Sequence, residues 1–229
     1  MAELARWQAQ GNVYLVADRP LTADAVRAEV GDTDGILEVT ARGGDWLELV
    51  IWNPDGSQAE LSGNGTRIAA RWLAEQTGAE LVTVRVGPRD VTARMLGGGL
   101  VEQDLGPVVV GETEEVAGIR FTPVDVGNPH AVVEGNPDDL PDIGPRLETH
   151  PRFPQRTNVQ VARIDAPGRV TARVWERGVG ETQASGTSAV AVAAATHGEG
   201  EVIVSFPGGD LTVRLAGGEA TLIGPAAPM

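Results

Sequence analysis

Two stretches of the chain share one pattern, in which a strand-like apolar run is followed by a polar turn and then by a helix-like run. In the first stretch, residues 47–52 (LELVIW) precede residues 67–75 (RIAARWLAE). In the second, residues 170–175 (VTARVW) precede the Ala-rich run 189–195. Strand side chains repeat every two residues and helix side chains every 3.6, so each stretch predicts a strand, a turn and a helix.

The spacing within the two stretches also agrees. A Trp closes each predicted strand, and a Ser-Gly pair begins ten positions later, at Ser62 after Trp52 and at Ser185 after Trp175. Each pair lies in a small-residue turn where a strand leads into a helix. Such a turn presents backbone N–H groups at the positive end of a helix dipole, where a carboxylate or phosphate is stabilised. Ordinary capping of the helix by the Ser side chain explains the same residues, and the two roles are compatible.

The repeated pattern predicts an α+β fold of two similar lobes, residues 1–112 and 113–229, with a ligand held between them. A Gly-Asn pair leads into an early strand of each lobe, at residues 11–12 and 127–128. The acidic, weakly patterned segment 106–116 marks the boundary. The predicted strands are residues 12–17, 36–40, 47–52, 81–86, 91–96, 124–126, 131–134, 157–164, 170–175, 202–206, 211–215 and 221–223. Helices are predicted over residues 21–30, from Ser62 to about Gly78, and over 189–195, and residues 136–145 form a loop or a short capped helix.

Composition narrows the classes of function. The chain of 229 residues carries 32 Asp and Glu against 18 Lys and Arg, a net charge of −14, which argues against nucleic acid as a partner. There is no Cys, so disulfides, thiolate metal sites and Cys nucleophiles are excluded, and three dispersed His make a metal site unexpected. No apolar run is long enough to span a membrane, and the first ten residues lack the features of a secretory leader, so we expect a cytoplasmic protein.

Five motifs, in order, resemble those of the diaminopimelate epimerase family. They are residues 53–57 (NPDGS), 62–67 (SGNGTR), 127–130 (GNPH), 156–158 (RTN) and 176–182 (ERGVGET). The resemblance extends from Gly11 to about Pro225. It implies two pseudo-symmetric lobes, each a β-barrel-like sheet around a central helix. It also implies a cofactor-independent isomerase that inverts the α-carbon of a diaminodicarboxylic amino acid, on the route to lysine and peptidoglycan, and it leaves a homodimer open.

The resemblance also implies a set of site residues. The family uses two cysteines on opposite faces of the substrate as base and acid, and these positions fall on Ser62 and Ser185, with His130 and Glu176 nearby as candidate bases. Glu176 and Arg177 are expected to pin the distal amino-acid end of the substrate. The other expected substrate-binding residues are Asn12, Asn53, Gly63, Asn64, Asn128, Asn158, Gly186 and Thr187. The Asn residues can donate and accept hydrogen bonds, although a turn-forming role explains several of them equally well.

Serine at both positions is the main departure from the family. At pH 7 a thiol with a pKa of ~8.5 loses its proton for roughly 2 kcal/mol, whereas a hydroxyl with a water-like pKa of about 15 requires on the order of 11 kcal/mol. Three explanations are therefore open: engineered substitutions, a branch that uses hydroxyls or performs another reaction such as a dehydration, and an amino-acid-binding relative without turnover. A phenazine-biosynthesis-type isomerase shares the expected architecture, but the paired Ser-Gly turns and the Glu-Arg-Gly run argue against it.

Overall fold

The computed structural model describes residues 4–229. The first three of the ten N-terminal residues discussed above therefore lie outside the described part of the chain. The chain divides into two compact units: unit 1 is Met1–Asp104 with Ile223–Met229, and unit 2 is Leu105–Leu222. This division differs from the boundary at 112/113 expected from the sequence. The last residues of the chain belong to unit 1, because strand β19 (Ala227–Pro228) pairs with β1 (Ala5–Ala9).

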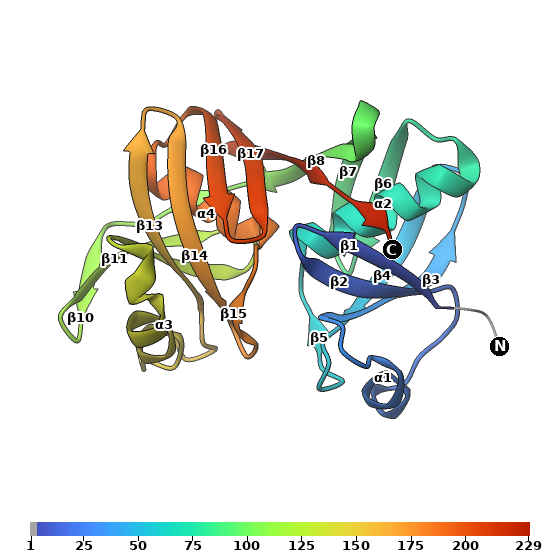
Figure 1. Ribbon diagram of the computed structural model, residues 1–229, viewed down its shortest axis with the longest axis horizontal. Coiled ribbons are helices and arrows are strands. Elements are labelled where there is room, and N and C mark those ends of the chain that lie inside the picture. The colour runs from blue at the N-terminus through green and yellow to red at the C-terminus, as the bar shows by residue number, and fades with distance from the viewer. Residues whose placement is uncertain (1–3) are drawn as a thin grey trace. The chain divides into compact units, whose positions relative to one another are not determined.

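Unit 1 is a set of strands around helix α2 (Gly63–Thr77) (Figure 1). A shorter helix, α1 (Ala23–Glu29), follows the second strand, and a 3-10 turn (Gly97–Gly99) precedes the eighth. Parallel pairs β2/β3 and β4/β6 are joined by antiparallel pairs β1/β2, β3/β4, β6/β7 and β7/β8. The strands after β1 are β2 (Asn12–Ala17), β3 (Gly35–Arg42), β4 (Trp46–Trp52), β5 (Gln58–Ala59), β6 (Leu81–Val86), β7 (Arg89–Met95) and β8 (Leu100–Pro107).

Unit 2 repeats this arrangement around helix α4 (Gly186–Thr196). Parallel pairs β12/β13 and β14/β16 are joined by antiparallel pairs β11/β12, β13/β14 and β16/β17. Helix α3 (Leu140–Glu148) and a 3-10 turn (Pro137–Asp139) take the place of α1 in the chain order. The strands are β9 (Val109–Val110), β10 (Glu114–Val116), β11 (Ile119–Asp125), β12 (Pro129–Glu134), β13 (Asn158–Ala166), β14 (Arg169–Glu176), β15 (Gly180–Thr182), β16 (Gly200–Phe206), β17 (Gly209–Ala216) and β18 (Glu219–Pro225).

The strand registers make the two units equivalent residue by residue around the predicted site. Trp52 lies opposite Ile36 in unit 1, and Trp175 lies opposite Val159 in unit 2. Both Trp indoles donate to a carboxylate, that of Glu38 at 2.6 Å for Trp52 and that of Glu148 at 2.8 Å for Trp175. The predicted α+β class and the two similar lobes are confirmed.

The two central helices form for different reasons. Helix α4 is apolar on every side and is buried from Gly186 through Ala194, as expected of a helix enclosed by strands. Helix α2 depends more on its ends: the Ser62 side chain accepts from the Gly65 N–H, and Gly78 closes the helix with a left-handed φ of 77°. A glycine adopts that conformation without the steric cost that a Cβ would add. The predicted limits of α2 are therefore correct.

The structure adds elements that the hydrophobic pattern did not predict. Strands β1, β8, β9 and β10 are not among the predicted strands, and β11 begins at Ile119 rather than at 124. Residues 136–145 form a 3-10 turn and then α3, which runs on to Glu148 because Leu140 and Leu147 pack into the core of unit 2. Pro145 lies inside this helix, so tertiary packing outweighs the local preference of proline to end it.

Candidate functional site

Ser62 is the N-cap of α2 and is half-buried. Its hydroxyl oxygen accepts from the Gly65 N–H at 3.0 Å, and its carbonyl accepts from the Thr66 N–H and hydroxyl, both at 2.9 Å. The phenol oxygen of Tyr14, on β2, lies 3.4 Å from the Ser62 hydroxyl oxygen, within reach of a weak hydrogen bond. Ser62 therefore caps α2 and also contacts the ionisable side chain of Tyr14.

Buried polar side chains support the first turn of α2. Asn64 donates to the carbonyl oxygen of the Asn12 side chain at 2.8 Å and accepts from the guanidinium of Arg67 at 2.7 Å. Arg67 is completely buried and also donates to the carbonyl oxygens of Pro225 and Gly63. The oxygens of Pro225, Gly63 and Asn64 that accept from its guanidinium are all neutral. Asn12 and Asn64, predicted to bind substrate, are thus part of one network that reaches into the core of unit 1.

Among residues 4–229, no carboxylate pairs with the Arg67 guanidinium. Burial lowers the pKa of Arg67 to about 9, which still leaves the group charged at neutral pH. A cation held one turn below the N-terminus of α2 adds to the positive end of the helix dipole. This half of the predicted site is therefore positive although the chain as a whole is strongly acidic.

Ser185 is the N-cap of α4 and is only 5% exposed, but its side chain makes no capping hydrogen bond. Its carbonyl accepts from the Ala189 N–H at 2.9 Å, as expected for the first turn of a helix. Because the Ser185 side chain takes none of the first N–H groups of α4, those groups are not capped as they are in α2. Gly186 and Thr187, predicted to bind a carboxylate, are the first two residues of this helix.

His130 is at the centre of a buried chain of hydrogen bonds in unit 2. One ring nitrogen, Nε2, lies 2.9 Å from the Asn128 side-chain oxygen, and the other, Nδ1, lies 3.0 Å from the amide nitrogen of Gln160. Asn128 in turn donates to the Thr187 hydroxyl at 3.4 Å. The Gln160 amide also donates to the Ser188 hydroxyl. This chain connects the core to the first turn of α4.

The same hydrogen bonds fix the ionisation state of His130. With Nε2 donating to an amide oxygen and Nδ1 accepting from an amide nitrogen, the ring is the neutral tautomer protonated on Nε2. Burial lowers the pKa of His130 to about 3, and the charge of Arg177 adds to this shift. In the structure the ring orients Asn128, while its predicted role as a base stays a prediction.

Asn158 and the turn after β14 form the rest of the unit 2 arrangement. The Asn158 amide donates to the Pro129 carbonyl at 2.9 Å, and its oxygen accepts from the Arg177 backbone N–H at 3.0 Å. Glu176, the last residue of β14, accepts from the Thr182 hydroxyl at 2.6 Å. The structure thus brings Asn158, Glu176 and Arg177 together through the backbone of one turn, with the side chains of Glu176 and Arg177 half-buried.

Asn53 differs from the other predicted Asn residues in its contacts. Its side chain donates to the Ser57 hydroxyl at 2.9 Å, and its backbone N–H donates to the Ser57 carbonyl at 2.8 Å. These bonds close the turn between β4 and β5, which is the turn-forming role weighed from the sequence. A role in substrate binding stays a prediction for Asn53.

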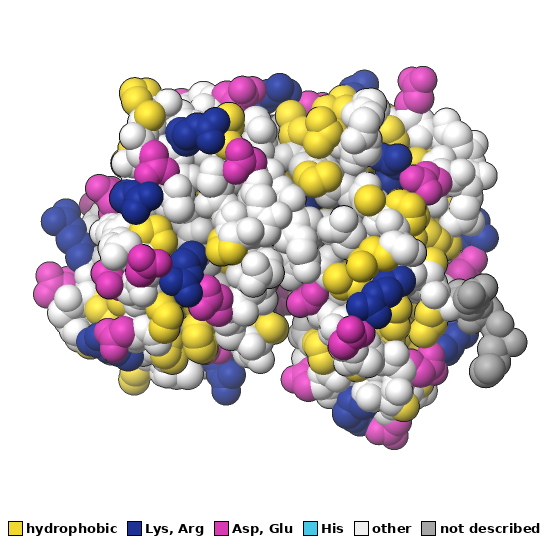
Figure 2. Space-filling view, viewed as in Figure 1, with side chains coloured by type: hydrophobic (Ala, Val, Ile, Leu, Met, Phe, Trp, Pro, Cys, Tyr) yellow, Lys and Arg dark blue, Asp and Glu magenta, His cyan; other side chains and the backbone are white. Residues whose placement is uncertain are grey.

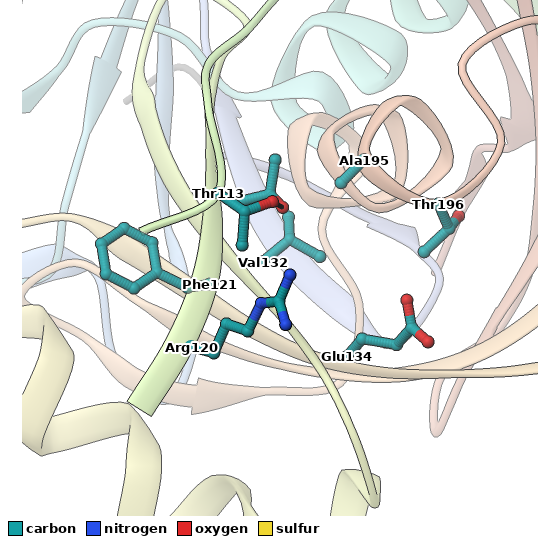
Figure 3. A pocket seen from close by; sticks show the side chains of 8 residues that line it. Thr113, Arg120, Phe121, Val132, Glu134, Ala195 and Thr196 are labelled. Atoms are coloured by element: carbon teal, nitrogen blue, oxygen red, sulfur yellow. Dashed lines mark hydrogen bonds between the residues drawn. The ribbon is translucent and has the colours of Figure 1, made fainter. Parts of the chain in front are cut away.

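A cavity of about 370 Å³ in unit 2 lies away from these residues (Figure 3). Arg120 and Glu134 reach it from β11 and β12, and Ala195 and Thr196 reach it from the C-terminal end of α4. A helix rises 1.5 Å per residue, so this end is roughly 14 Å from the N-terminus that carries Ser185. None of the predicted site residues lines this cavity.

Three residues of the site were not among the sequence candidates: Tyr14, Arg67 and Gln160. The sequence did carry a signal for Tyr14, because it stands two places after Asn12 as His130 stands two places after Asn128. Arg67 lies within the motif of residues 62–67, but the sequence gave no sign that this basic residue of a predicted helix is completely buried. Gln160 occupies an inward position of β13 and gave no signal.

Acidic and basic side chains are interspersed on the face shown in Figure 2. Within residues 4–229, no helix is both long and apolar enough to cross a membrane.

Comparison with known proteins places the chain in a family. A family model described as diaminopimelate epimerase matches residues 122–226. A diaminopimelate epimerase of Synechococcus sp. (strain JA-2-3B'a(2-13)) is 35% identical, over 91% of this chain and 84% of the relative. One from Sphingopyxis alaskensis is 35% identical, over 95% of this chain and 91% of the relative.

Solved structures support the fold. A probable proline racemase from Agrobacterium radiobacter K84 has a TM-score of 0.72 at 17% identity, covering 99% of this chain and 90% of its own. A phenazine biosynthesis protein of the PhzF family from Bacillus anthracis has a TM-score of 0.74 at 11% identity, covering 99% and 96%. At these identities the likeness shows the fold alone. Taken with the sequence relatives, it leads to one conclusion: the chain belongs to the diaminopimelate epimerase family.

Proposed function

We propose that the protein is a cofactor-independent epimerase that converts LL- to meso-diaminopimelate, with Ser62 and Ser185 in the two acid–base positions. The observation that carries the proposal is the matched pair of strand–turn–helix units, each with a serine as N-cap of its central helix. Inversion needs a base on one face of the α-carbon and an acid on the other, and two equivalent units supply one group each. The family membership supports the same reaction class.

The first turns of α2 and α4 would hold the α-carboxylate. Gly63 and Asn64 begin α2, and Gly186 and Thr187 begin α4. Backbone N–H groups at a helix N-terminus stabilise a carboxylate and the negative charge that develops beside it when the α-proton leaves. Helix α4 suits this role particularly well, since its N-cap side chain does not occupy these groups.

The distal end of the substrate would bind at the turn after β14. Arg177 and Glu176 provide one cation and one anion for a carboxylate and an ammonium group. Asn158 fixes the backbone of Arg177 and would keep the pair in place. Arg177→Ala should weaken diaminopimelate binding by about 2–4 kcal/mol, because the distal carboxylate would then be desolvated without its partner.

A second candidate is an amino-acid-binding protein of the same family without turnover. The observation that favours it is that both acid–base positions hold hydroxyls, and that the Ser62 hydroxyl already accepts a hydrogen bond from its own helix. A hydroxyl without an effective base gives up its proton at a cost several kcal/mol higher than a thiol does.

The experiment compares the parent with Ser62→Cys, Ser185→Cys, the double Cys variant and the two Ser→Ala variants. LL-to-meso conversion and uptake of deuterium at the α-carbon from D₂O are measured for each. We expect slow conversion by the parent, lost in either Ala variant, and at least a roughly 1000-fold gain in the double Cys variant. Tight binding of diaminopimelate with no exchange in any variant would favour the binding protein instead. If the parent and the double Cys variant neither bind nor convert diaminopimelate, the substrate assignment is wrong.

A further inference from the structure

Tyr14 holds the same place in unit 1 that His130 holds in unit 2. Each lies on the first strand of a parallel pair, opposite the first residue of the second strand: Tyr14 opposite Gly35, and His130 opposite Asn158. Each also lies two residues after the Asn that reaches toward the first turn of the central helix, Asn12 or Asn128. The fold therefore presents a ring with a polar edge at the same point in both units.

The two rings differ in what they contact. Both nitrogens of His130 are held by amide side chains of its own unit. The Tyr14 phenol instead lies 3.4 Å from the hydroxyl oxygen of Ser62, and its ring is half-buried. A Cβ at position 35 would come within 3.0 Å of the Tyr14 ring, so the absence of a side chain at Gly35 leaves the space that the ring uses.

The Ser62 hydroxyl is poorly suited to act on its own. Its oxygen accepts a hydrogen bond from the Gly65 N–H, which leaves its proton free to be directed toward an acceptor. An unassisted hydroxyl needs on the order of 11 kcal/mol to ionise at pH 7, whereas a phenol with an ordinary pKa near 10 needs only about 4 kcal/mol. Between the two oxygens, the phenol is the group whose ionisation lies within reach of catalysis at neutral pH.

We propose that Tyr14 is a positioning and proton-relay residue that acts through Ser62 and gives unit 1 its acid–base function. The inference rests on the proposed epimerase function. In the delivering direction, the Tyr14 O–H gives its proton to the Ser62 oxygen while the Ser62 proton passes to the α-carbanion, and a phenolate remains. In the abstracting direction, the Cα–H bond breaks, its proton goes to the Ser62 oxygen, and the Ser62 proton goes to the phenolate.

The relay makes the two faces of the substrate chemically unlike. A phenol is protonated at neutral pH, so the resting state of unit 1 is the proton donor. The base in the same turnover then comes from unit 2, at the Ser185 position. After release, the phenolate gains a proton from solvent and the unit 2 base loses one, which returns both units to their starting state.

The main test is Tyr14→Phe, which removes one oxygen and keeps the ring. We expect kcat for LL-to-meso conversion to fall by about 100-fold or more, with KM within about threefold, as for the loss of a general acid. α-Deuterium uptake without inversion should persist for the isomer whose proton leaves toward unit 2, so the ratio of exchange to inversion should rise. Tyr14→His should restore part of the activity, because it keeps a titratable ring at the position.

A second measurement does not depend on activity. Tyr14 is the only tyrosine of the chain, so tyrosinate absorbance during a pH titration reports this one phenol. We expect its titration midpoint to differ between the parent and Ser62→Ala, while Ser185→Ala leaves it unchanged. Equal midpoints in all three proteins would overturn the pairing of Tyr14 with Ser62.

The outcomes separate the inference from the proposed function. Conversion by the parent that is unchanged in Tyr14→Phe would overturn the relay and leave the epimerase function standing. An equal fall of exchange and inversion with a raised KM would show that the ring only packs the site. Should no form of the protein act on diaminopimelate, the epimerase function fails, and the titration alone decides whether the two oxygens are coupled.

Discussion

Units 1 and 2 share strand order, register and the position of a serine at the start of the central helix, yet the surroundings of the two serines differ. Ser62 caps its helix and contacts a phenol, above a completely buried guanidinium. Ser185 does not cap its helix with its side chain. The fifth residue after the cap is Arg67 in unit 1 and Val190 in unit 2, and both are fully buried.

The difference shows how a repeated fold surrounds equivalent residues with different side chains. The backbone of each unit positions a serine as the N-cap of its own central helix, while side chains on the neighbouring strands set the environment of that helix end. Unit 1 surrounds its serine with a buried charge and an ionisable phenol. Unit 2 places a neutral imidazole and amide groups beside the first turn of α4, at Thr187 and Ser188. An inversion reaction needs one side to accept a proton while the other donates one, and unlike surroundings are one way to separate the two.

The largest expected effect comes from the position opposite Tyr14. In Gly35→Ala the new Cβ would overlap the Trp52 carbonyl oxygen and crowd the Tyr14 ring, and φ at this residue is +157°. We expect a loss of about 4 kcal/mol or more in the free energy of unfolding. Urea unfolding checks this, with Asn158→Ala at the equivalent place in unit 2 as control. That control should lose about 1–2 kcal/mol, since only its two hydrogen bonds disappear. Equal losses would contradict the difference in packing.

Next is the buried charge. Arg67→Val gives unit 1 the residue that unit 2 has at Val190, and it removes the guanidinium donor from the oxygens of Pro225, Gly63 and Asn64. The free energy of unfolding should be about 3 kcal/mol lower than in the parent, because hydrogen bonds are lost and a void remains. Val190→Ala, measured in the same way, should lose about 1–2 kcal/mol. A more stable Arg67→Val would show that desolvation of the guanidinium outweighs its hydrogen bonds, and that Arg67 is retained for the site.

The burial of His130 should make the free energy of unfolding depend on pH. Its pKa falls from 6.5 to about 3 on folding, so the unfolded chain binds more protons between these values. Stability is therefore complete above pH 6.5 and falls as pH decreases, with this residue contributing a loss of about 2–3 kcal/mol by pH 4.5. Comparing urea unfolding of the parent and His130→Gln at pH 7 and pH 4.5 isolates the contribution. If both proteins lose the same stability on acidification, His130 is not the group responsible.

The smallest effect concerns the two caps. Ser62→Ala removes the acceptor for the Gly65 N–H and should cost about 1 kcal/mol. Ser185→Ala removes no capping bond and should cost less than about 0.5 kcal/mol. Thermal unfolding of the two variants side by side measures the difference. A larger loss for Ser185→Ala would mean that its hydroxyl has a stabilising partner in solution.

The sequence by itself determined the features that depend on local pattern and spacing. The period-two and period-3.6 runs located α2 and most of the long strands, and Gly78 marked the end of α2 correctly. The Trp-to-Ser spacing identified the repeat, because equal chain lengths between a strand end and a helix start give equivalent local geometry. The motifs identified the family.

Only the tertiary structure decided how the repeated residues are used. Complete burial of Arg67, the neutral state of His130 and the contact between Tyr14 and Ser62 join segments up to 158 residues apart, as for Arg67 and Pro225. Chain-local patterns carry no information on such pairs, because burial and hydrogen bonding depend on which strands become neighbours. For the same reason β1, which pairs with β19 at the other end of the chain, was not predicted, and Pro145 did not end α3, which packs into the core of unit 2.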